Sequence, residues 1–239
     1  MLPAIFLALV IAWIHAAGVD FRLAGSQFYD AASHTWIGAH TWWAERLVHT
    51  GGRDFVRAIT AGALVIFAAS WISTRWQPLR REAGYVVLAI VLSTGIVGLL
   101  KHVTNVDCPW DLTDFGGTHD YVSLFGQRAA GLPRVACFPG AHSSAGFALM
   151  CFYFILRDRS PRAARIALLA GILTGALFAF AQEARGAHFI SHDLTSAAIV
   201  WFVQLAAYVI LLSPRVARAA ASAAHPVLPA CRNELRAPE

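Results

Sequence analysis

Hydrophobic positions dominate six long stretches of this 239-residue chain, and polar and charged positions gather between them. A hydrocarbon core about 30 Å thick requires roughly 20 apolar residues per helix. The pattern therefore predicts an all-α fold, an integral membrane bundle of six transmembrane helices. The predicted spans lie at residues 2–18, 55–73, 84–100, 143–157, 164–182 and 194–212.

The two ends of the chain need separate interpretations. Residues 2–17 have the length of a signal peptide's apolar region. No basic stretch precedes them, and the number of spans stays even only if they remain, so an uncleaved span is favoured. Residues 214–239 show no convincing apolar face. They are predicted to form a flexible cytoplasmic tail after a membrane domain over residues 1–213.

The composition and the arginine positions give the predicted orientation. The chain is 57% hydrophobic and only 14% charged, whereas soluble domains carry about a quarter charged residues. Eleven of the nineteen basic residues lie in or beside the connections 74–83 and 158–163 and in the tail. Positive-inside bias places these stretches and both termini in the cytoplasm. The other loops then face the periplasm of a bacterial inner membrane. The basic residues form no stripe, so nucleic acid is not an expected partner.

Ionisable side chains gather where this topology places the outer ends of the later spans. They are Lys101, His142, Arg185, His188 and His192. Ionisable groups at membrane depth are costly and usually mark function. Gly140 and Ala141 open a helix whose first amides would be unpaired, which is an arrangement that binds phosphate. The Ser143 hydroxyl either caps this helix or contacts the phosphate.

Two of these histidines arrive from different helices. One of His142 and His188 can act as a nucleophile and the other as a general acid. His192 follows His188 by four residues, which places both on one face of a helix. Its ring is therefore predicted to hydrogen-bond the His188 ring and fix the tautomer.

The three segments together resemble the phosphatidic acid phosphatase type 2 superfamily, which shares its site with vanadium haloperoxidases and bacterial acid phosphatases. The motifs of that family are Lys-x6-Arg-Pro, Pro-Ser-Gly-His and Ser-Arg-x5-His-x3-Asp. The matching positions in this chain are Lys101 with Pro109, Pro139 with His142, and His188. The order, the spacing and the topology agree over most of residues 84–212.

Two arginines of the family pattern are absent. Cys108 stands at the first position, where Arg134 or Arg128 of the same loop could compensate. Gln182 stands at the second position, and Arg185 follows it by about one helical turn. The predicted phosphate ligands are therefore Lys101, Arg185 and Arg134, together with the groups at the start of the helix.

The aspartate of the third motif is also absent, because His192 occupies its position. Asp193 is adjacent, but it would point about 100° away from His192 on a continuous helix. Asp107 and Asp111 are further candidates for orienting His188.

The resemblance implies a metal-independent lipid phosphatase without a cofactor, whose partners are a phosphorylated membrane lipid and the bilayer. His188 would form a phosphohistidine, and His142 would protonate the leaving oxygen. Lipid A or undecaprenyl diphosphate is favoured as substrate, with phosphatidylglycerophosphate and phosphatidate as further candidates. A lipid phosphotransferase, an inactive lipid-binding protein and a haem-binding membrane protein remain alternatives.

The cysteines and the remaining histidines are assigned structural roles. Cys108 and Cys137 share a loop on the oxidising side and are predicted to form a disulfide, with a zinc pair as the alternative. Cys151 and Cys231 are expected to be inert. The histidines expected to be structural are His15, His34, His40, His49, His102 and His119.

Overall fold

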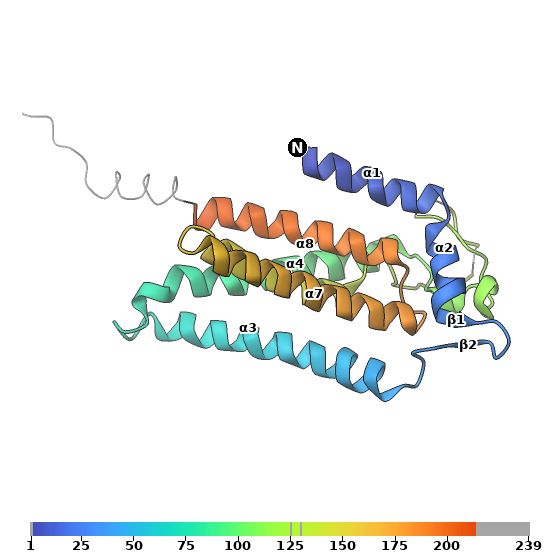
Figure 1. Ribbon diagram of the computed structural model, residues 1–239, viewed down its shortest axis with the longest axis horizontal. Helices are drawn as coiled ribbons and strands as arrows, with labels where there is room; N and C mark the ends of the chain where they lie inside the picture. Colours follow the sequence, from blue (N-terminus) through green and yellow to red (C-terminus); the bar gives the residue numbers. More distant parts are fainter. Residues whose placement is uncertain (1, 125, 130, 214–239) are drawn as a thin grey trace, which may run out of the picture.

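The computed structural model describes residues 2–124, 126–129 and 131–213, and most of these residues are helical (Figure 1). The predicted tail at 214–239 lies outside the described residues. Four long helices extend along the bundle, namely α3 (Gly52–Ala69), α4 (Arg80–Thr104), α7 (Pro161–Ala184) and α8 (Ile190–Leu211). Helix α4 packs against both α3 and α8. Helix α1 (Leu2–Ala16) packs on α8 and continues into α2 (Val19–Leu23) after a bend.

A shorter helical segment fills the centre of the bundle. It consists of α5 (Ala141–Phe147), the 3₁₀ turn η6 (Ala148–Met150) and α6 (Cys151–Leu156). It crosses α7 at very short range, since a Cβ added to Gly146 would lie 2.7 Å from the Gly175 Cα. A Cβ on Gly171 would lie 2.6 Å from the Met150 nitrogen. The glycines of α7 thus allow the segment that begins at the candidate site to lie deep in the bundle.

All six predicted spans coincide with helical segments, so the prediction of an α-helical membrane protein is confirmed. Three stretches are long and apolar enough to cross a bilayer, namely Gln77–Asp111, Pro161–Ala184 and Ile190–Leu211. Ile5–Ala16 and Val19–Phe28, bent by 65° at a short break, would count as a fourth if they form one span. Six crossings therefore remain a proposal.

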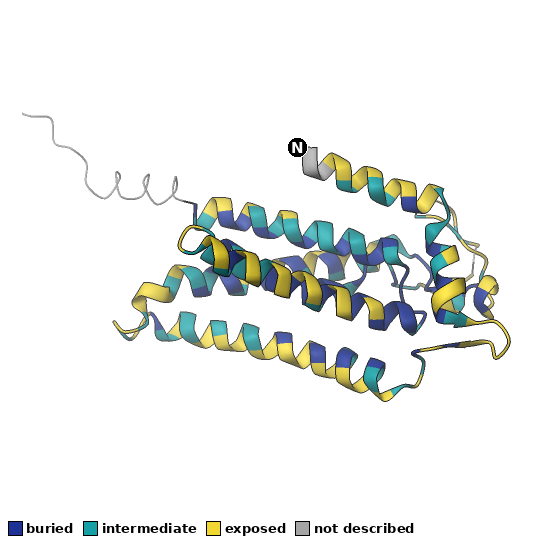
Figure 2. Ribbon diagram, in the orientation of Figure 1, coloured by how far each residue is buried: buried dark blue, intermediate teal, exposed yellow. Residues whose placement is uncertain are grey.

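The outward faces of the helices are apolar. Figure 2 shows exposed residues along the outer sides of α3 and α7. They include Val65, Ile166, Leu173 and Leu177. An apolar surface of this extent is typical of contact with lipid acyl chains.

Short elements close the end of the bundle where α4 ends and α8 begins. They are the π-helices η1 (Ala24–Phe28) and η2 (Trp43–Gly51), the strands β1 (Tyr29–Asp30) and β2 (Thr35–Trp36), and the 3₁₀ turns η4 (Pro109–Asp111) and η5 (Thr113–Phe115). A further 3₁₀ turn, η3 (Gln77–Leu79), precedes α4 at the opposite end. The two short strands form an antiparallel pair that was not predicted.

Aromatic packing fixes the loop between α7 and α8. Phe21, Phe115 and Phe189 form one cluster with Trp36. Gly186 has a φ of +73°, and a Cβ there would lie 2.3 Å from the Trp36 ring. The loop that carries His188 is therefore packed closely against this aromatic cluster.

Candidate active site

A pocket of about 410 Å³ opens at this end of the bundle. Its walls come from η2 and α3, the end of α4, the start of α5 and the α7–α8 loop. The predicted site residues that line it are Lys101, Ala141, His142, Arg185 and His188. The fold thus brings residues from three distant segments of the sequence to one cavity.

The most ordered feature of this pocket is a buried histidine–carboxylate pair. His188 Nδ1 donates to Asp193 Oδ1 over 2.9 Å, and the two residues are 4% and 2% exposed. A carboxylate can only accept here, so the proton lies on Nδ1 and Nε2 keeps its lone pair. Burial lowers the pKa of His188 well below its ordinary value, and the charges of Lys101 and Arg185 lower it further. The pair therefore presents a neutral, oriented imidazole.

Asp193, and not His192, orients the histidine, which corrects the prediction. The rings of His188 and His192 lie 6.0 Å apart and share no hydrogen bond. Helix α8 begins only at Ile190 after an extended Phe189, so the spacing of four residues does not place the two rings on one helical face. His192 instead packs edge-on against Phe189 and Phe138, and its Nδ1 has no partner among the described residues.

Residues at the start of α5 support the pair of His188 and Asp193 through hydrogen bonds. Ser143 is buried, and its hydroxyl donates to Asp193 Oδ1 over 2.5 Å, so it supports the carboxylate and is not free to contact a phosphate as predicted. The Gly140 amide donates to the His192 carbonyl over 3.2 Å, which also removes it from the predicted set of phosphate ligands. Ala141 lines the pocket as predicted.

Replacing Gly140 with alanine is expected to lower kcat roughly 10- to 100-fold, because small displacements of reacting groups are costly. The new Cβ would lie 2.2 Å from Asp193 Oδ1 and 2.8 Å from His188 Nδ1, so the pair would have to move. Gly95→Ala in α4 is the control, since no atom lies within 4 Å of its added Cβ. Equal kcat values for Gly140→Ala and the wild type would contradict this geometry.

His142 also lines the pocket. Its ring stacks between His49 and Phe178, with centroid distances of 4.6 and 4.9 Å. Its Nε2–H donates to the Val48 carbonyl over 3.3 Å. The second ring nitrogen is then left for proton exchange in the pocket.

Two cations line the pocket together with these histidines. Lys101 and Arg185 are half-buried and line the pocket. Arg185 Nη1 donates to Gln182 Oε1 over 3.0 Å, so glutamine at the family's arginine position orients the arginine that replaces it.

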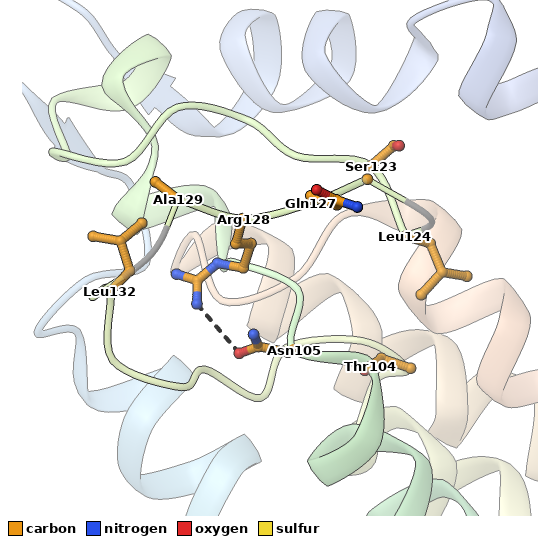
Figure 3. A pocket seen from close by; sticks show the side chains of 9 residues that line it. Thr104, Asn105, Ser123, Leu124, Gln127, Arg128, Ala129 and Leu132 are labelled. Carbon is orange, nitrogen blue, oxygen red and sulfur yellow. Dashed lines mark hydrogen bonds between the residues drawn. The ribbon is translucent and has the colours of Figure 1, made fainter.

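The loop arginines do not reach the pocket, which corrects a second prediction. Arg134 donates to the His102 carbonyl over 2.6 Å. Arg128 binds both oxygens of Asp107 at 2.8 and 2.6 Å, and Figure 3 shows its further bond to Asn105 above a separate pocket. Asp107 also pairs with His119 and is therefore unavailable to His188. This network joins Arg128 and Pro133 to the residues that follow α4.

A disulfide joins Cys108 to Cys137, with the Cα atoms 5.2 Å apart. Both residues line the pocket and are buried. The position that carries arginine in the family pattern is thus a neutral cross-link between the loop after α4 and the approach to α5.

Two residues of the pocket were missed by the sequence interpretation. His49 was expected to be structural, and Arg53 was not considered, yet both line the cavity. They lie four residues apart, His49 in the π-helix η2 and Arg53 at the start of α3. The sequence shows two basic residues separated by four positions, but no known motif contains this pair. In the part of the chain that the structure describes, no group of three or more His, Cys, Asp or Glu residues is arranged to hold a metal ion.

Comparisons with known proteins concern the family and the fold. The sequence model of the PAP2 superfamily matches residues 82–214, which is more than half of the chain. No curated protein matches significantly. Among solved structures, the fold is similar to the first transmembrane PAP2 type phosphatidylglycerolphosphate phosphatase from Bacillus subtilis. The TM-score is 0.53 at 14% identity, over 85% of this chain and 90% of that one. At this identity the likeness shows the fold.

Proposed function

We propose, on the premise that the chain belongs to the PAP2 superfamily, that it is a membrane lipid phosphatase acting through a phosphohistidine. The observation that carries this proposal is the buried pair of His188 and Asp193 in a pocket with two cations and a second histidine. The resemblance found in the sequence motifs is confirmed at the level of the family. The reaction and the substrate are proposals.

The chemistry follows from the hydrogen bonds. The lone pair of His188 Nε2 attacks phosphorus, forming a P–N bond while the P–O bond to the lipid breaks. The departing oxygen takes a proton from the imidazolium form of His142, from the ring nitrogen that does not bond Val48, and leaves that ring neutral. Asp193 balances the positive charge that the His188 ring acquires. Water then loses a proton to His142 and attacks phosphorus, the P–N bond breaks, and phosphate leaves.

Charge on the transferring phosphoryl group is stabilised by the half-buried cations. Lys101 and Arg185 lie on the same pocket as the nucleophile, where water screens them less than at an open surface. Arginine can grip two phosphate oxygens at once, and the Gln182 contact fixes its direction.

The substrate is proposed to be a lipid whose phosphate lies at headgroup depth. The pocket opens at the ends of apolar helices whose outer faces suit acyl chains. Lipid A and undecaprenyl diphosphate are favoured, ahead of phosphatidylglycerophosphate and phosphatidate. The proposed setting is the bacterial inner membrane, with six spans, cytoplasmic termini and a periplasmic site, as the arginine distribution predicts.

Phosphate release tests this function. The full chain, purified in detergent with EDTA, is given each of these four lipids, and free phosphate is measured with time. We expect release from at least one lipid, unaffected by the chelator. Release that requires added metal would contradict the proposed mechanism. Release that appears only with an added acceptor alcohol, recovered as its phosphate ester, would identify a phosphotransferase.

The pH profile should reflect the lowered pKa of His188. A lowered pKa keeps the nucleophile neutral in mildly acidic solution, so the acidic limb of kcat/KM should lie below the ordinary histidine value of about 6.5. The profile is measured after correction for the titration of the lipid phosphate, followed by phosphorus NMR in the same micelles. Lys101→Met should move the limb to higher pH. A corrected limb at or above the ordinary value would contradict the assignment.

A further inference from the structure

One cation of the pocket comes from a helix outside the family match. The neutral Cys108 stands at one arginine position of the family pattern, and the two loop arginines that could replace it point elsewhere. Arg53 lies at residue two of α3, well before the matched segment 82–214. It lines the same cavity as Lys101 and Arg185.

The guanidinium of Arg53 is free to take an anion. Its Nε forms an ion pair with Asp54 Oδ1 at 3.6 Å, and the Arg57 guanidinium lies 3.1 Å from the same oxygen. Among the described residues, Nη1 and Nη2 of Arg53 make no hydrogen bond. Arg128, in contrast, uses all three of its guanidinium nitrogens on protein partners.

The charges around the cavity favour a polyanion. Its lining residues include Arg53, Lys101 and Arg185, and no carboxylate belongs to the described lining. The pKa of His49 is lowered by burial and then by the charges of Arg185 and Arg53, against an opposing effect of Glu45. A ligand group with two or three negative charges suits these three cations.

Depth distinguishes Arg53 from the other two cations. Its side chain is 44% exposed, whereas Lys101 and Arg185 are half-buried. Arg53 therefore lies toward the mouth of the pocket, where a phosphate enters and where a second phosphate of a diphosphate would remain.

We propose that Arg53 is a substrate-binding residue that contacts phosphate oxygens of the lipid at the mouth of this pocket. The inference rests on the proposed function and extends the site to α3. It assigns to the η2–α3 junction a binding role, with His49 holding His142 by stacking and Arg53 receiving the anion.

The test compares Arg53→Gln and Arg53→Lys with Arg57→Gln, which removes a neighbouring charge on the same helix outside the pocket lining. Each protein is assayed with a lipid monophosphate and a lipid diphosphate of the same chain. Loss of a charge-assisted phosphate contact should lower kcat/KM for Arg53→Gln roughly 10- to 100-fold, mainly through KM. Partial recovery is expected in Arg53→Lys, and no change in Arg57→Gln.

The two lipids locate the contact. A loss on both places Arg53 at the attacked phosphoryl group, and a loss confined to the diphosphate places it at the second phosphate. An Arg53→Gln enzyme with unchanged KM on both lipids would overturn the inference, as would an equal loss in Arg57→Gln.

A binding measurement separates this inference from the proposed function. Orthovanadate, a phosphate analogue, is titrated by calorimetry into wild type and Arg53→Gln. Tighter binding by wild type supports the contact even if no lipid is hydrolysed. Equal binding overturns the inference but not the phosphatase, and binding by neither protein contradicts both.

Discussion

His188→Gln is expected to abolish phosphate release, with kcat lower by roughly 10⁴-fold or more, as when a covalent nucleophile is removed from other enzymes. Glutamine can still donate an amide N–H to Asp193, so the buried carboxylate keeps a partner and the loop keeps its support. What disappears is the nitrogen lone pair at the inner wall of the pocket. His142 keeps one ring nitrogen on the Val48 carbonyl, and the proposed mechanism uses its other nitrogen for proton transfer.

Single-turnover assays with labelled lipid measure the effect directly. Wild type should accumulate a base-stable, acid-labile phosphoenzyme, as expected for a P–N bond, and His188→Gln should form none. His40→Gln changes an exposed histidine beside the pocket elements and serves as the control. A phosphoenzyme in His188→Gln at the wild-type level would assign the nucleophile elsewhere.

The helices were predictable because membrane insertion imposes a simple requirement on sequence. Backbone groups in lipid must be satisfied within a segment, so runs of apolar residues specify helices. The segments 84–100, 164–182 and 194–212 fall inside α4, α7 and α8, whose observed ends extend a few residues further. The polar residues at those ends, such as Lys101, mark the site but do not end the helix.

The gathering of the polar residues in one pocket was predictable for a different reason. Lys101 and His142 lie at the ends of separate helices and His188 lies just before α8, and an expected common membrane depth brings such positions together. The family spacing then assigned their roles. No part of this inference required knowledge of the intervening loop.

The predicted contacts that the structure does not contain depend on geometry that the spacing of residues does not specify. The distance of four residues from His188 to His192 implies a shared face only within one helix, but α8 begins after His188. The loop after α4 is long enough to direct Arg134 away from the pocket. Helix η2, which carries His49, has π-helical spacing and no motif. The hydrophobic pattern alone therefore could not show that η2 lines the pocket.

Asp193→Asn is expected to lower kcat by about 10²- to 10⁴-fold while leaving the fold intact, as for the orienting aspartate of a catalytic triad. The amide oxygen can still accept from the Ser143 hydroxyl, which lies 2.5 Å from Asp193 Oδ1. It cannot balance the charge that His188 acquires when the P–N bond forms. The amide nitrogen could also turn toward the ring and stabilise the wrong tautomer.

His192→Gln is the matched comparison, because the sequence leaves the orienting role open between His192 and a nearby aspartate, and in the structure Asp193 makes the contact. Both side chains are buried in the first turn of α8, so a general loss of packing would affect both variants. The comparison requires kcat on one lipid together with the thermal midpoint of each variant in detergent. A large loss in Asp193→Asn with at most a few-fold loss in His192→Gln assigns the orientation of the nucleophile to the carboxylate. The opposite order would place the orienting contact on the His192 ring, and would require the α7–α8 loop to rearrange when substrate binds.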